Sequence, residues 1–71
     1  MMKHVDVDST LIHSIRYDDA HRMLEITFND DGTYRYFEVE PEVVEEFLDA
    51  ESKGGFFVDH IRDTYLFTRM W

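Results

Sequence analysis

The feature that most constrains the fold is a β-hairpin signal in the middle of the chain. Residues 23–28 alternate between apolar and polar side chains, which is the pattern of a strand with one buried face. The next five residues, 29–33, read Asn-Asp-Asp-Gly-Thr. Asn and Asp close a type I turn through their side chains, and Gly32 can adopt a positive φ angle. We therefore predict a hairpin whose second strand runs over residues 34–39.

The register of this hairpin decides where Tyr34 and Tyr36 point, because residues at i and i+2 of a strand share one face. With a bulged type I turn at Gly32, Tyr34 opposes Phe28, and both tyrosine rings join the core. With a tight Asp31-Gly32 turn, both rings move to the other face, where they can stack single-stranded bases. The Asn-Asp-Asp-Gly-Thr string favours the bulged turn, and the tight turn stays as the alternative.

Two helices are expected after the hairpin. Pro41 suits the first position of a helix, and we predict that this helix runs to Lys53. Gly54 and Gly55 then supply the left-handed residue that commonly ends a helix. Residues 56–62 are predicted to form a second, short helix, since their apolar side chains recur four residues apart.

The remaining segments predict the fold class. Residues 11–17 suit a partly buried strand, and the apolar residues 65–71 suit a short edge strand or a segment that docks on the core or on a second copy. We predict an α+β fold, with a three-stranded, mostly antiparallel sheet packed against one main helix plus a short C-terminal helix.

Seventy-one residues allow one domain, with residues 1–8 expected to be a flexible start. The chain has no cysteine, so stability has to come from packing, and it shows no signal peptide or membrane-spanning run. A cytoplasmic location and no membrane partner are therefore expected. The formal net charge of -9 at pH 7 repels polyphosphate at long range.

The residue pattern that best indicates a binding site is Tyr34-Arg35-Tyr36, two aromatic rings flanking a cation. Three further cations in the last third of the chain can form a basic patch with it. The alternative is that these cations are solvated and pair with the surplus carboxylates. The candidate binding residues are Tyr34, Arg35, Tyr36, Lys53, Arg62 and Arg69.

Catalytic and metal motifs are not found in the sequence. The four histidines lack metal-motif spacing, although His4, Asp6 and Asp8 alternate along one extended segment. There is no nucleophile elbow and no phosphate-binding loop, and so short a domain hardly encloses a water-excluding pocket. We therefore predict no enzymatic activity, no cofactor and no metal. Residues 42–51 make the outer side of the first helix strongly acidic, which is typical of a solvated face and also suits a basic protein partner.

The ordered set of short motifs resembles the KTSC domain family, named for its occurrence at the C-terminus of some lysyl-tRNA synthetases. The resemblance covers most of the chain and rests on Val7-Asp8-Ser9-Thr10-Leu11-Ile12, Tyr17-Asp18, Tyr34-Arg35-Tyr36, Ala50-Glu51-Ser52-Lys53-Gly54, Phe56-Phe57 and Ile61-Arg62. It implies a small domain of bacteria or phages, found alone or appended to larger proteins. It also implies association with RNA or tRNA, for which Tyr34 and Tyr36 are the positions to test.

Together these observations predict a small, non-enzymatic binding module with two alternative partners. RNA is expected from the family resemblance. The alternative is a protein–protein interaction module that uses its acidic helix, which suits a basic partner, or its apolar C-terminal segment. The chain is expected to be a monomer or a homodimer formed through that C-terminal segment.

Overall fold

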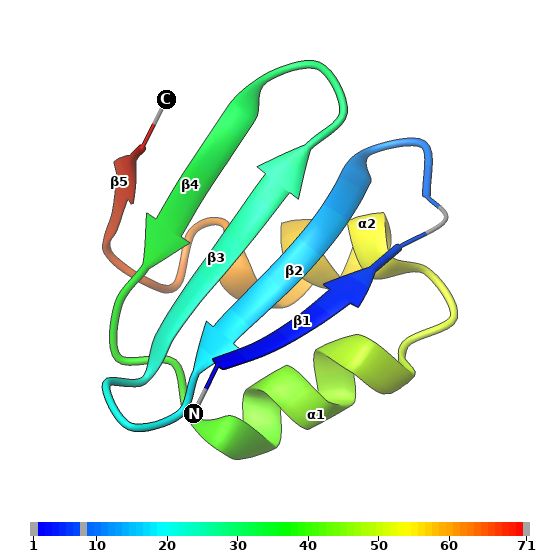
Figure 1. Ribbon diagram of the computed structural model, residues 1–71. Helices are drawn as coiled ribbons and strands as arrows, with labels where there is room; N and C mark the ends of the chain where they lie inside the picture. Colours follow the sequence, from blue (N-terminus) through cyan, green and yellow to red (C-terminus); the bar gives the residue numbers. More distant parts are fainter. Residues whose placement is uncertain (1, 8, 71) are drawn as a thin grey trace.

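A computed structural model describes residues 2–7 and 9–70 and shows a two-layer arrangement in which two helices cover one face of an antiparallel sheet (Figure 1). The sheet has five strands in the order β1-β2-β3-β4-β5. Its strands are β1 (Met2–Asp6), β2 (Ile12–Asp18), β3 (Met23–Phe28), β4 (Gly32–Tyr36) and β5 (Phe67–Arg69). Between β4 and β5 lie α1 (Pro41–Asp49), α2 (Lys53–Phe56) and a π-helical turn, η1 (Phe57–Ile61), that continues α2.

The predicted α+β class is confirmed, but the prediction of three strands is wrong, because a strand is added at each edge of the sheet. Strand β1 pairs with β2 from Met2 opposite Asp18 to Asp6 opposite Ser14. Strand β5 returns after the helices and pairs with β4. Neither edge strand has the alternation of apolar and polar residues seen in β3. Each is held in the sheet by backbone hydrogen bonds to its neighbouring strand, β2 or β4.

The hairpin register differs from both predicted registers but keeps the tyrosines on the core face. Ile26 lies opposite Tyr34, and Phe28 lies opposite Gly32, whose φ angle is 82°. The bulged turn placed Phe28 opposite Tyr34, so the observed pairing is shifted by two residues. Because side chains alternate with a period of two, this shift leaves each ring on its predicted face. The tight-turn alternative, which moves both rings to the other face, is wrong.

The first helix ends four residues before the predicted position. It begins at Pro41, as expected, and ends at Asp49. Gly55 does not terminate this helix but lies within α2, which Lys53 begins. The reason is local, since the Ser52 hydroxyl accepts a hydrogen bond from the Gly55 backbone N–H at 2.9 Å and so caps a new helix.

The core lies between the sheet and the helices. One of its members is Tyr17, whose buried hydroxyl donates a 2.7 Å hydrogen bond to the Val39 carbonyl. Within the described residues, no helix is long and apolar enough to cross a membrane. The buried core residues are Ile12, Ile15, Tyr17, Leu24, Ile26, Tyr36, Val39, Val44, Phe47, Phe57 and Ile61.

Candidate functional site

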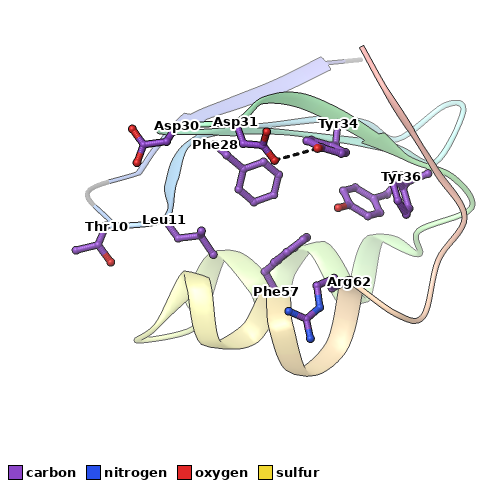
Figure 2. Close-up of a pocket in the computed structure, with 10 residues that line it drawn as sticks. Thr10, Leu11, Phe28, Asp30, Asp31, Tyr34, Tyr36, Phe57 and Arg62 are labelled. Carbon is purple, nitrogen blue, oxygen red and sulfur yellow. Dashed lines mark hydrogen bonds between the residues drawn. The ribbon is translucent and has the colours of Figure 1, made fainter. Parts of the chain in front are cut away.

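A pocket of about 350 Å³ opens between the β3–β4–β5 part of the sheet and the α2–η1 helical segment (Figure 2). Three separate parts of the chain build it: the loop before β2, the β3–β4 hairpin, and the segment from η1 to β5. The lining residues are Thr10, Leu11, Phe28, Asp30, Asp31, Tyr34, Tyr36, Phe57, Arg62 and Phe67.

Five aromatic side chains form a closed circuit of ring contacts in the lining, and we call these five residues the aromatic cluster. Phe28 contacts Tyr34 and Phe57, with ring centroids 5.5 and 5.1 Å apart. Tyr36 contacts Phe57 at 5.7 Å and Phe67 at 5.5 Å. Tyr34 and Phe67 close the circuit at 5.7 Å. Each member therefore touches two others, and together they supply five of the ten lining residues.

The strand geometry explains how these rings converge. Tyr34 and Tyr36 point to the same face of β4 because they are two residues apart, and Phe67 of β5 lies opposite Tyr36. Phe57 approaches from η1 on the helix side. Tyr36 and Phe57 are 3% and 5% exposed, whereas Phe67 is 52% exposed. The first two therefore form the floor of the pocket, and Phe67 stands at its mouth.

Two tyrosine hydroxyls differ in their surroundings. The Tyr34 hydroxyl donates a 2.9 Å hydrogen bond to Asp31, and this bond raises the pKa of Tyr34 above its ordinary value. The Tyr36 hydroxyl points into the pocket (Figure 2), and none of the described residues makes a hydrogen bond to it. Burial raises the pKa of Tyr36 to about 12, so this hydroxyl stays protonated at neutral pH.

The pocket rim carries both signs of charge, with carboxylates in excess. Asp31 pairs with Arg69 at 3.4 Å, and Arg62 pairs with Asp63 at 3.6 Å. The Asp30 carboxylate is exposed and makes no ion pair within the part of the chain that the structure describes. Asp30 is thus the rim charge that is available to a ligand.

The structure brings together four of the six candidate binding residues. Tyr34, Tyr36 and Arg62 line the pocket, and the guanidinium of Arg69 lies 5.7 Å from the centre of the Tyr34 ring. The other two lie elsewhere, and each is engaged. Arg35 lies on the opposite face of the sheet, where it donates hydrogen bonds of 2.8 and 3.1 Å to Glu25.

Lys53 donates a 2.6 Å hydrogen bond to the Ala50 carbonyl and lines a separate, more polar hollow beside α1. The six residues therefore do not form one basic surface. No cluster of metal-ligating side chains occurs within the described ranges, and His4 bonds to Asp6 at 3.0 Å. Asp8, the third residue of that alternating segment, lies outside the described residues.

Seven of the ten lining residues were not among the candidate binding residues: Thr10, Leu11, Phe28, Asp30, Asp31, Phe57 and Phe67. The three phenylalanines belong to a strand, a helix and an edge strand that are far apart in the sequence. Each was interpreted as an apolar core or docking residue. The one usable signal was the high number of aromatic residues, six Phe and four Tyr in a short chain, because such side chains serve binding surfaces as well as cores.

The fold and the pocket define a small two-layer α+β domain with an aromatic hollow at one end of its sheet. The chain belongs to the KTSC domain family, whose family model matches residues 8–65, and the predicted resemblance is therefore confirmed. The matched range includes four members of the aromatic cluster, and the fifth, Phe67, lies just after its end.

Relatives and a solved structure agree with this assignment. An uncharacterised protein of Stutzerimonas stutzeri is 41% identical over 56 residues, which is 79% of each chain. A protein of Tsukamurella paurometabola is 44% identical over 50 residues, covering 70% of this chain and 75% of its own. The crystal structure of a KTSC domain protein from Yersinia pestis superposes with a TM-score of 0.95 at 39% identity, covering all of both chains.

Proposed function

We propose that the protein is a non-enzymatic binding module whose aromatic pocket receives one exposed side chain of a basic protein partner. The observation that carries the proposal is the aromatic cluster, which lines a pocket of about 350 Å³ and leaves Phe67 half exposed at the mouth. This volume is at the small end of ligand pockets, about 300–1,000 Å³, and suits one side chain better than a large cofactor.

The chemistry of the pocket supports binding rather than catalysis. Its most buried polar group is the Tyr36 hydroxyl, whose pKa of about 12 is far from the working pH of a general acid or base. Tyr34 is engaged with Asp31, and no histidine lines the pocket. These groups suit holding a ligand through apolar contact and hydrogen bonding.

The charges favour a protein partner over RNA. Binding to nucleic-acid phosphates needs Lys or Arg side chains that are free to neutralise them, but Arg35 and Arg69 are paired with Glu25 and Asp31. The tyrosines lie in the wall of a pocket instead of forming an open stacking platform. A partner with a basic surface matches the net charge of -9 and the exposed Asp30 at the rim.

Peptides of the form acetyl-Arg-Gly-X-Gly-Arg-amide, with X as Gly, Leu, Phe or Lys, test this proposal. The arginines supply the same basic flanks in every peptide, so only the central side chain varies. We expect saturable NMR shifts at Phe28, Tyr34 and Phe57 when X is large, and weaker or unlocalised shifts when X is Gly. Equal, unlocalised shifts for all four peptides would show that the pocket receives no side chain.

A matched pair of variants localises the binding. Phe67→Ala removes one residue of the aromatic cluster and is expected to weaken binding about 2- to 10-fold, the effect of one aromatic contact. Leu66→Ala is the control, because Leu66 is the preceding residue, is 80% exposed and does not line the pocket. In a parallel titration, single-stranded RNA that shifts the same residues and loses affinity with salt, with no response to the peptides, would favour an RNA ligand instead.

A further inference from the structure

Resting on the proposed function, we infer that the side chain held in the pocket is a lysine, bound through its ammonium group. Four observations lead to this ligand: the arrangement of the rings, a cation that one ring already holds, the charge at the rim, and the unpaired Tyr36 hydroxyl. Three of these belong to the pocket itself, and the cation is Arg69, which lies beside it.

The rings are arranged as walls and not as a stack. Phe28 meets Tyr34 at an interplanar angle of 83° and Phe57 at 66°, and Tyr36 meets Phe57 at 76°. Neighbouring rings set edge to face present their π faces in different directions, and those faces carry partial negative charge. Any of these faces that borders the hollow attracts a cation, and ammonium groups are bound over aromatic faces in this way.

One ring already holds a cation within the protein. The Arg69 guanidinium lies 5.7 Å from the centre of the Tyr34 ring and 3.4 Å from the Asp31 carboxylate. Arg69 does not line the pocket, so this contact leaves the hollow itself to a ligand. Tyr34 and Asp31 thus show, with an internal residue, the combination of ring and carboxylate that the inference assigns to the bound ammonium.

The polar groups of the pocket complete the match. Asp30 is an exposed carboxylate at the rim, and Arg62, the one cation among the described lining residues, is paired with Asp63. Deeper inside, the Tyr36 hydroxyl is directed into the pocket (Figure 2) and has no hydrogen-bond partner in residues 2–7 and 9–70. Its oxygen can accept a hydrogen bond from an ammonium N–H, which an alkyl or phenyl group does not provide.

Three peptides of the same Arg-Gly-X-Gly-Arg series test the inference, with X as lysine, trimethyl-lysine or norleucine. Norleucine keeps the unbranched aliphatic chain and lacks the charge, so it measures apolar contact alone. We expect lysine to bind about 3- to 30-fold more tightly than norleucine, the range of a cation over aromatic faces. Trimethyl-lysine keeps the charge, donates no hydrogen bond and adds three methyl groups, so weaker binding than lysine would report a hydrogen bond to the Tyr36 hydroxyl that outweighs the added apolar contact.

Two pairs of variants separate charge and ring effects from folding. Phe67→Leu keeps an apolar side chain at the half-exposed mouth and removes a π face, so it should reduce lysine binding and leave norleucine binding unchanged. Asp30→Asn should weaken lysine binding about 2- to 5-fold. Glu45→Gln is its control, since it makes the same change in net charge on the exposed side of α1.

The outcomes distinguish the inference from the proposal that it extends. Norleucine or Phe peptides that bind as tightly as the lysine peptide would overturn the lysine assignment and leave a pocket for apolar side chains. An equal loss of lysine binding in Asp30→Asn and Glu45→Gln would also overturn it, because the attraction would then come from the whole protein. No localised binding by any peptide above the Gly baseline would overturn the proposed function itself.

Discussion

Replacing Phe67 with Ala tests whether the contacts of this residue within the aromatic cluster stabilise the fold as well as forming the pocket. Phe67 is 52% exposed, so about half of its side chain is removed from water. Full burial of a phenylalanine is worth about 1.5–3 kcal/mol, which gives about 1 kcal/mol for this residue. Its ring contacts with Tyr36 at 5.5 Å and Tyr34 at 5.7 Å add about 0.5 kcal/mol or more.

We therefore expect Phe67→Ala to lower the free energy of unfolding by about 1–2 kcal/mol. For a domain of this size that corresponds to a fall in Tm of about 4–15 °C. Urea and thermal unfolding followed by circular dichroism measure both quantities. Leu66→Ala is the control, because Leu66 is 80% exposed, and it should change stability by less than about 0.5 kcal/mol. An unchanged midpoint for Phe67→Ala, or an equal loss in Leu66→Ala, would refute the reasoning.

Four further predictions follow from other contacts. Gly32→Val should destabilise the fold by about 1 kcal/mol or more in urea unfolding, because a β-branched residue is strained at a φ angle of 82°. Ser52→Ala should cost about 0.5–2 kcal/mol by losing the cap on Gly55 N–H; a larger loss in the neighbouring Glu51→Ala would contradict this assignment. Burial raises the pKa of Tyr36 in the folded state to about 12, whereas in the unfolded chain the pKa is about 10. The unfolded state therefore loses this proton first, and the free energy of unfolding should fall as pH rises from about 10 towards 12. Tyr36→Phe should show a smaller alkaline loss in urea titrations, and equal losses would argue against burial of the hydroxyl. Arg62→Gln removes the like charge at the rim and should strengthen binding of the lysine peptide about 2-fold by NMR titration, whereas weaker binding would contradict the lysine assignment.

The local sequence determined the elements whose signals lie within a few residues. Strand β3 has the predicted bounds, because its alternating pattern and the following turn residues act over short distances. Helix α1 begins at Pro41 as predicted, because the fixed φ of proline suits the first helical position. The face of Tyr34 and Tyr36 was also predictable, since a register shift by two residues leaves side-chain direction unchanged. Family membership follows from the same ordered motifs.

Only the tertiary structure decided how distant segments meet. Strand β1 has no strong pattern of its own and exists through its pairing with β2, and β5 pairs with β4 only after two intervening helices. The partners of the cations were equally unpredictable, because Arg35 meets Glu25 through cross-strand register. The aromatic cluster depends on all of these strand pairings and on the position of the helices at once. Its members come from β3, β4, η1 and β5, so no short stretch of sequence contains the pocket that they enclose.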